Sequence, residues 1–249
     1  MWMIRLATTQ DSEMSLHHLS FRKERGAENM ATDMWLLENI ESWGGLAFRR
    51  YGWTEPQTTF GYGQKASWVE QATNKKSKEL IRRPTGGGVV QHRTDLTYCM
   101  VLSKGTDAEK MPPMELYGLI HQRWGESLGK ENISTCLMPC PDKSKGGIPG
   151  DCFKEPVGRD LMNGEGTLKL GGAAMKRTRK GVLIQGSLEL GEWPGLDHGV
   201  IEKEFLLLIA SDFNESISTK EWPDGLEADR LSLVNTYSSN SWTQGRRAP

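Results

Sequence analysis

Residues 82–98 read RRPTGGGVVQHRTDLTY, and the three glycines at their centre carry the most informative local signal in the chain. Successive glycines let the backbone approach a ligand with no side chain in the way. Their N–H groups can bind an anion or a polar carbonyl, and Arg82 or Arg83 can add charge-assisted hydrogen bonds to a phosphate or carboxylate. The spacing fits neither a GxxxxGK[ST] phosphate loop nor a dinucleotide-binding fingerprint. From these residues alone, a ligand-binding turn and a flexible hairpin turn both stay open.

Three further segments turn this signal into a resemblance. They are residues 29–33 (NMATD), 50–64 (RYGWTEPQTTFGYGQ) and 168–188 (LKLGGAAMKRTRKGVLIQGSL). In order and content, the four segments resemble the lipoate–protein ligase and octanoyltransferase superfamily, which is related to biotin–protein ligases. The resemblance covers roughly residues 26–190. It implies an α/β (α+β) fold with a mixed, mostly antiparallel sheet flanked by helices, the class II synthetase-like fold of biotin and lipoate ligases.

Local patterns outline the elements of this fold. Apolar residues at helical spacing predict helices at residues 30–42, 68–74, 112–129 and 201–210. Short β-branched or aromatic runs between turn residues predict strands at residues 47–53, 58–62, 80–83, 89–91, 96–102, 167–173 and 181–190. We expect a catalytic domain at 26–210, an extension or edge element at 1–25, and a partly irregular segment at 211–249 that is disordered from 238 onward.

Composition limits the classes of function. The chain has 249 residues, a formal net charge of −1 and four cysteines. No overall charge favours nucleic acid or membrane, no apolar run is long enough to span a bilayer, and we expect no secretion signal. Four cysteines are too few for a disulfide scaffold in a chain of this size. We therefore expect a cytoplasmic protein with reduced thiols, and a monomer, as is common in the family it resembles.

Lys169 corresponds to the central lysine of the family. A fixed ammonium stabilises the negative charge that develops on an acyl carbonyl under attack. Without the resemblance, a solvent-facing lysine on a strand is the simpler interpretation. The resemblance also implies that the substrate is bound by residues of the glycine turn and of the strand after Lys169: Arg83, Thr85, Gly86, Gly87, Gly88, His92, Gly171, Gly172 and Ala173. One departure concerns His92, because Arg93 stands where the family usually has Asp, and an acid returns only at Asp95.

Cys152 lies in Asp151-Cys152-Phe153 and resembles the nucleophile of one branch of the octanoyltransferases. A thiolate can attack an acyl thioester and hold the acyl group as a new thioester. Nearby cations such as Lys169 would lower the pKa of the thiol. The alternative is a small buried residue in a loop. Cys136 and Cys140 provide no complete zinc-ligand set with Cys152, so no metal site is predicted.

Three functions remain open. The first is transfer of an octanoyl or lipoyl group from acyl carrier protein, through Cys152, to a lysine of a lipoyl domain, and it needs no cofactor. That domain would belong to the glycine cleavage H protein or to a 2-oxoacid dehydrogenase E2 subunit. The second is an ATP- and Mg²⁺-dependent lipoate ligase that uses Lys169 and an acyl-adenylate. The third is a non-catalytic binding module. A basic run at 176–180 is either a solvated turn or a docking patch for acidic partners.

Overall fold

The computed structural model describes residues 15–140 and 156–247. The strands are β1 (Ser15–Glu24), β2 (Leu46–Trp53), β3 (Gln57–Phe60), β4 (Leu80–Arg82), β5 (Val90–His92), β6 (Leu96–Ser103), β7 (Thr135–Leu137), β8 (Leu161–Asn163), β9 (Lys169–Arg177), β10 (Gly181–Leu188) and β11 (Ser216–Lys220). The helices are α1 (Gly26–Trp43), α2 (Ala66–Thr73), α3 (Asp107–Lys110), α4 (Pro113–Gly129), α5 (His198–Asp212), α6 (Leu226–Asp229), α7 (Leu231–Ser238) and α8 (Asn240–Gly245), with a 3₁₀ turn at Ser77–Glu79.

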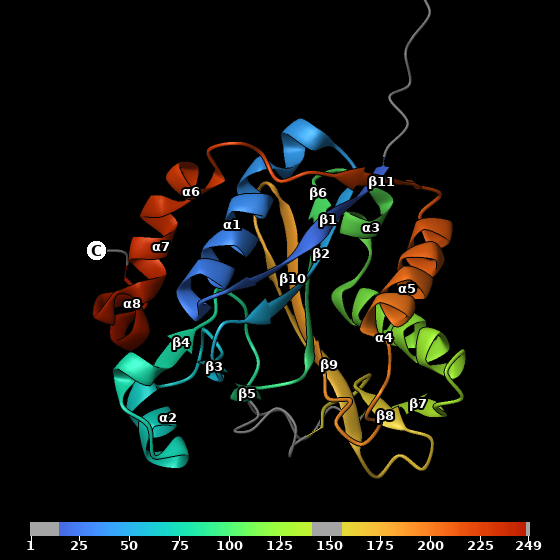
Figure 1. Cartoon of the computed structure of the whole chain (residues 1–249), viewed down its shortest axis with the longest axis horizontal. Coiled ribbons are helices and arrows are strands. Elements are labelled where there is room, and N and C mark those ends of the chain that lie inside the picture. The colour runs from blue at the N-terminus through green and yellow to red at the C-terminus, as the bar shows by residue number, and fades with distance from the viewer. Residues whose placement is uncertain (1–14, 141–155, 248–249) are drawn as a thin grey trace, which may run out of the picture.

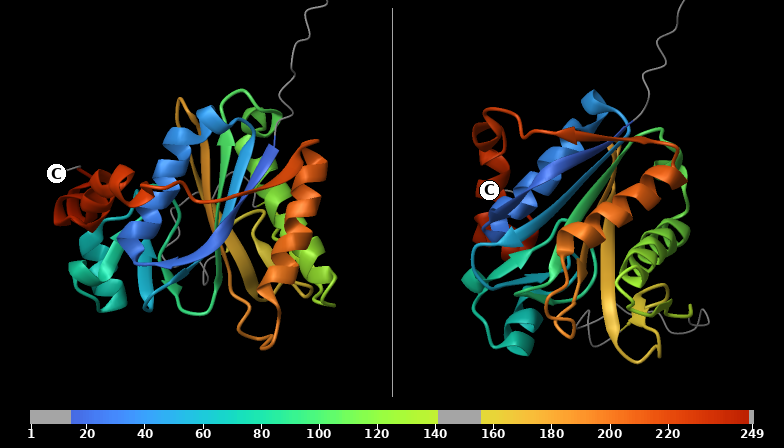
Figure 2. Two further views of the ribbon diagram at one scale, coloured as in Figure 1. Left: turned by 45° about the horizontal axis from the view of Figure 1, so that its top comes forward. Right: turned by 45° about the vertical axis from the view of Figure 1, so that its right-hand side comes forward.

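A large sheet forms the centre of the molecule, with helices on both faces (Figures 1 and 2). Its strand order within the described residues is β11-β1-β2-β6-β10-β9-β8-β7, and a smaller sheet has the order β4-β3-β5. In the large sheet β1 runs parallel to both β2 and β11, whereas the other neighbours are antiparallel. The expected mixed, mostly antiparallel sheet with flanking helices is therefore confirmed.

Alternating side chains on the central strands build two separate cores. On β2, Leu46 and Phe48 belong to the core shared with α4 and α5, whereas Ala47 and Tyr51 belong to the core shared with α1. Successive residues of a strand point to opposite faces, so β2 contributes side chains to both cores. The face of β9 and β10 on the α1 side also carries polar residues, and the smaller sheet stands beside it (Figure 1).

The structure differs from the sequence-based expectations near both ends of the chain. Residues 15–24 form β1, which is not an edge element, because β2 and β11 both pair with it. The expected disorder from 238 onward is wrong for the part the structure describes, since α8 occupies Asn240–Gly245. Tyr237 packs with Met30 and Ala31 of α1, so α7 lies along α1, and α8 lies near β4 (Figure 1). The domain boundaries stay a prediction.

Candidate functional site

The triple glycine forms the turn that joins β4 to β5. Arg83 shapes it from inside, because its Nη2 atom donates to the carbonyls of Gly86 and Gly88, both at 2.8 Å. Gly87 has a φ of +82°, which favours glycine. A Cβ atom on Gly61 would lie 1.9 Å from the Gly87 carbonyl oxygen, so the preceding loop also approaches the turn as bare backbone.

Arg82 binds backbone carbonyls of the protein itself, whereas the sequence had suggested that it could contact a ligand. It is 1% exposed. Its guanidinium donates to the carbonyls of Tyr62 at 2.6 Å, Gln64 at 2.8 Å and Thr243 at 2.8 Å. These acceptors lie in the loop after β3 and in α8. Arg82 therefore ties the C-terminal helix to the base of the glycine turn.

Thr85 connects the glycine turn to the large sheet. Its hydroxyl donates to Gln185 Oε1 on β10 at 2.6 Å, and Gln185 Nε2 donates to Asp33 Oδ2 on α1 at 2.6 Å. Asp33 in turn forms an ion pair of 2.7 Å with Arg49 on β2, and both side chains are fully buried. The position of the turn over β10 is thus set by a buried polar chain that reaches two further elements.

His92 pairs with an acid after all, although Arg93 interrupts the family pattern. Its Nδ1 atom lies 2.8 Å from Asp95 Oδ2, and its Nε2 atom lies 2.9 Å from the Thr59 hydroxyl. Asp95 Oδ2 also accepts from Ser187 at 2.5 Å and from Thr97 at 2.8 Å. Burial alone would raise the pKa of Asp95, but His92 and these hydroxyls lower it to about 2. The carboxylate therefore fixes the Nδ1–H tautomer of His92.

Lys169 begins β9 with its ammonium in a buried network. Its Nζ atom lies 2.6 Å from Asp160 Oδ2, and the lysine residue is 6% exposed. The Tyr117 hydroxyl donates to Asp160 Oδ1 at 2.5 Å, and the Val157 N–H donates to Oδ2 at 2.7 Å. Neither Asp160 nor Tyr117 was recognisable from the sequence as a site residue. The signal for Asp160 was its place in the segment after Cys152 that resembles the octanoyltransferases.

The strand pairing brings Lys169 to the same face as the glycine turn. A Cβ atom on Gly172 would lie 2.8 Å from Lys169 Nζ. Gly172 is paired with Ser187, and Ala174 is paired with Gln185, the partner of Thr85. Side chains two residues apart on a strand share a face. The structure therefore gathers Lys169, Gly172, Thr85 and the His92–Asp95 pair around one patch of β9 and β10.

Two predicted binding residues point elsewhere. A Cβ atom on Gly171 would lie 2.4 Å from Leu188, and Ala173 packs against the core shared with α4 and α5. The backbone N–H of Ala173 donates to the Tyr117 hydroxyl at 3.2 Å, so Ala173 supports the lysine network from behind. Cys152 lies outside the described residues. Of the described cysteines, Cys99 is buried, whereas Cys136 and Cys140 are exposed.

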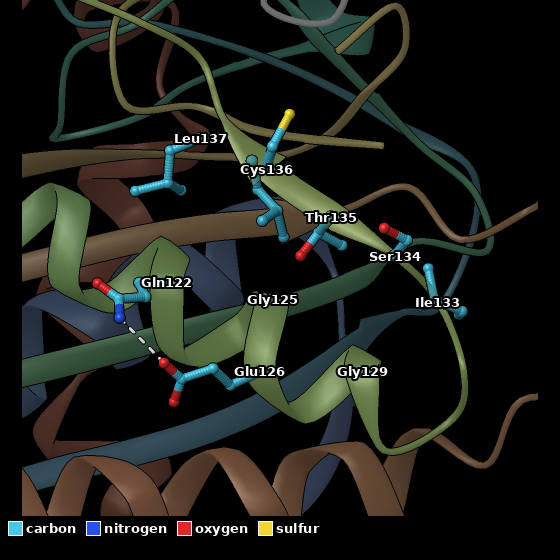
Figure 3. Close-up of a pocket in the computed structure, with 10 residues that line it drawn as sticks. Gln122, Gly125, Glu126, Gly129, Ile133, Ser134, Thr135, Cys136 and Leu137 are labelled. Atoms are coloured by element: carbon cyan, nitrogen blue, oxygen red, sulfur yellow. Dashed lines mark hydrogen bonds between the residues drawn. The ribbon is translucent and has the colours of Figure 1, made fainter. Parts of the chain in front are cut away.

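A pocket of about 430 Å³ lies between α4 and β7, and its lining includes neither Lys169 nor a residue of the glycine turn (Figure 3). Its lining combines small and apolar side chains with a few polar ones: Gln122, Gly125, Glu126, Gly129, Ile133, Ser134, Thr135, Cys136, Leu137 and Leu161. Over residues 15–140 and 156–247, no group of three or more His, Cys, Asp or Glu side chains is placed to hold a metal ion. No helix within the same ranges is long and apolar enough to cross a membrane.

Comparisons with known proteins give a family model and a set of related sequences. The family model described as the lipoyl protein ligase A/B catalytic domain matches residues 25–191. The chain is 35% identical over 149 residues to octanoyltransferase LipM of Carboxydothermus hydrogenoformans, covering 59% of this chain and 54% of that protein. It is 35% identical over 173 residues to octanoyltransferase LipM of Brevibacillus brevis, covering 64% and 59%. The chain thus matches somewhat more than half the length of these curated relatives.

Solved structures share the fold over almost the whole chain. Lipoate-protein ligase A bound with ATP superposes with a TM-score of 0.71 at 18% identity, covering 93% of this chain and 99% of that one. A structure of the bi-partite lipoate protein ligase from Thermoplasma acidophilum gives a TM-score of 0.68 at 16% identity, covering 95% and 98%. At these identities the likeness shows the architecture alone.

Proposed function

The chain belongs to the family of lipoyl protein ligase A/B catalytic domains, and from this membership we propose that it is an acyltransferase of lipoate metabolism. It moves an octanoyl or lipoyl group from acyl carrier protein to a lysine of a lipoyl domain, in the glycine cleavage H protein or in a 2-oxoacid dehydrogenase E2 subunit. The names of the octanoyltransferase relatives support this choice. Because the chemistry needs a reduced thiol, we place the proposed enzyme in the cytoplasm. We also propose that it acts as a monomer.

The proposed reaction has two steps. The Cys152 thiolate attacks the thioester carbonyl of the donor, and the thiol of the carrier leaves with a proton. The amine of the acceptor lysine then attacks the Cys152 thioester, forms the amide and releases the Cys152 thiolate. The amine gives one proton to solvent in this step, which balances the proton that the carrier thiol takes from solvent in the first. Because the acyl group arrives as a thioester and is held as one, the transfer needs no ATP. The role of Cys152 is supported by the resemblance of its segment to the octanoyltransferase branch.

The observation that carries the proposal is the placement of the Lys169 ammonium. Asp160 and Tyr117 hold it beneath Gly172, on the face of β9 and β10 to which Thr85 fastens the glycine turn. Each step develops negative charge on the acyl oxygen. A buried, pre-positioned ammonium stabilises that charge without having to reorganise.

The ATP-dependent ligase is the second candidate, because it would use the same glycine turn and the same lysine. It passes through an acyl-adenylate and requires ATP with Mg²⁺, and it gives Cys152 no task. The non-catalytic module is the third candidate. The buried hydrogen-bond network around Lys169 favours catalysis over this module, since a binding surface does not require a desolvated ammonium.

One experiment separates the three. The protein is incubated with octanoyl acyl carrier protein and a lipoyl domain without ATP, and both proteins are analysed by intact mass spectrometry. We expect one octanoyl group on the lipoyl domain, and on Cys152 when the acceptor is left out. Transfer that requires ATP and persists in Cys152→Ala would establish the ligase. Absence of transfer under both conditions would leave the binding module.

A further inference from the structure

An exposed tyrosine beside the glycine turn is flanked by two cations from distant parts of the chain. The Tyr62 ring, 39% exposed, lies 5.6 Å from Lys176 Nζ on β9 and 5.5 Å from the Arg246 guanidinium carbon just after α8. Its backbone N–H donates to the Thr85 carbonyl at 2.8 Å, so the cluster adjoins the turn directly. We call Tyr62, Lys176 and Arg246 the cationic cluster.

The cations of this cluster lack an acidic partner, unlike their neighbours. In the β9–β10 hairpin, Lys180 pairs with Glu41 at 2.5 Å, and Arg177 is bound by the carbonyls of Glu109 and Met111. By contrast, within the described residues no carboxylate lies within 4.0 Å of Lys176 or Arg246. The Arg246 charge also adds to burial in lowering the pKa of Arg82 to about 10. Two cationic groups therefore flank the exposed Tyr62 ring, and an anion is the group that would complement them.

The distance between the cationic cluster and the reacting carbonyl follows from the number of residues between them on β9. Gly172 lies over the Lys169 amine, and Lys176 is four residues further along β9 on the same face. At roughly 3.3 Å per residue, their backbones are separated by about 13 Å. A pantetheine arm runs from its sulfur through two amides and a branched hydroxyacid to a phosphate. Extended, it equals four or five residues of chain, or roughly 15 Å.

We propose that Tyr62, Lys176 and Arg246 form a subsite for the phosphate of the acyl donor's pantetheine arm. This inference rests on the proposed transferase function and adds a class of donor to it. With the thioester carbonyl at Lys169, the arm lies along β9 and its phosphate reaches the two cations beside the tyrosine ring. The same phosphate occurs in coenzyme A thioesters and in acylated carrier proteins.

The test compares three octanoyl donors: octanoyl acyl carrier protein, octanoyl-CoA, and octanoyl-pantetheine, which lacks the phosphate. The variant Lys176→Gln/Arg246→Gln removes two charges from the cluster. A matched control, Arg179→Gln/Arg247→Gln, removes two exposed charges from the same hairpin and the same C-terminal segment. Steady-state transfer to a lipoyl domain gives KM and kcat for every pair of enzyme and donor.

We expect the cluster variant to raise KM roughly tenfold for both phosphate-bearing donors and to leave octanoyl-pantetheine unchanged, because each exposed charge contributes modestly. The control should change every KM less than twofold. An equal loss with octanoyl-pantetheine, or an equal loss in the control, overturns the phosphate subsite. A loss confined to the carrier protein also overturns it, in favour of protein docking. If the wild type uses octanoyl-pantetheine, the transferase stands whichever of these results is found.

Discussion

The position of the Lys169 ammonium depends on its contacts with two neighbouring residues. Asp160 accepts from it on one side, and bare backbone at Gly172 leaves room for it on the other. A catalytic group displaced by about 1 Å can lose on the order of a hundredfold in rate. The space above the amine therefore matters as much as its counterion, although a glycine in a strand gives no sign of this on its own.

Gly172→Ala should lower kcat for acyl transfer at least tenfold, with a much smaller effect on stability. The new Cβ atom would lie 2.8 Å from Lys169 Nζ, and the flexible lysine would have to move. Transfer assays with urea unfolding would show this separation. In Gly129→Ala, where a Cβ atom meets nothing within 4 Å, activity should be retained. Unchanged kcat in Gly172→Ala would contradict the placement of the amine.

The sequence identified the residues that carry the chemistry better than the residues that hold them in place. The glycine turn, Lys169 and His92 were recognisable because they lie in short, contiguous motifs. Asp95 looked out of register, yet the β5–β6 connection brings it within 2.8 Å of His92. The contact between Thr85 and Gln185 spans 100 residues and depends on how the two sheets meet, which no local pattern encodes.

Among the elements, α4 carries a buried titratable side chain, His121. His121 on α4 is fully buried, and its Nδ1 atom lies 2.7 Å from the Arg159 carbonyl. Asp160 and Lys169 are the charged groups that act on it, with opposite effects. Burial lowers the pKa of His121 from 6.5 to about 4. The folded protein therefore keeps this imidazole neutral where the unfolded chain binds a proton.

Stability should accordingly fall as the pH drops below about 6.5. Between the two pKa values the unfolded state binds more protons, so the free energy of unfolding rises with pH, and His121 alone removes about 2 kcal/mol by pH 5. Burial also lowers the pKa values of His17 and His198, which act in the same direction. Urea titrations at pH 7 and pH 5 measure the difference. In His121→Leu it should shrink by about 2 kcal/mol, and an unchanged difference would refute the assignment.

The elements after residue 211 show why part of the fold was missed. All residues of β11 from Ser216 to Thr219 are exposed, and α7 buries only Tyr237. Such segments lack the apolar periodicity that identifies a strand or helix. They are ordered instead by contacts with distant parts of the chain, such as the pairing of β11 with β1 and the bond between Arg82 and Thr243.

Arg82→Met should destabilise the protein by roughly 3 kcal/mol, because it leaves the buried carbonyls of Tyr62, Gln64 and Thr243 without their donor. The glycine turn should also become more accessible to proteases. Thermal melts with limited proteolysis provide the measurement. Arg25→Met, which changes an exposed arginine, is the matched control. A variant as stable as the wild type would show that Arg82 does not hold the turn.

Across the whole molecule, a buried charge cluster joins the two ends of the described chain to the sheet. Glu24, the last residue of β1, pairs with Arg49 on β2 at 3.4 Å and with Arg230 before α7 at 2.7 Å. Arg230 also donates to Thr32 on α1. Charges this deeply buried need every partner, since a lone buried ion costs several kcal/mol.

Glu24→Gln should therefore lower the free energy of unfolding by about 3–5 kcal/mol. Of the two buried guanidiniums, Arg49 would keep Asp33, whereas Arg230 would lose its buried carboxylate partner in the described part of the chain. Glu227→Gln is a suitable comparison, because this partner of Arg22 is 65% exposed and should change stability by less than about 1 kcal/mol. Equal effects of the two substitutions in urea unfolding would contradict the cluster's role.

The hydrogen bond from Arg82 to Thr243 also determines when the glycine turn can become ordered during synthesis of the chain. Its partners are 161 positions apart. At translation rates of about 5–20 residues per second, the ribosome needs roughly 8–30 s to go from one to the other. During that interval the glycine turn has been synthesised, but the hydrogen bond from Arg82 to Thr243 cannot yet form. Ribosome-bound chains that stop before Thr243 should therefore be cut by protease within residues 82–92, whereas the released protein should resist.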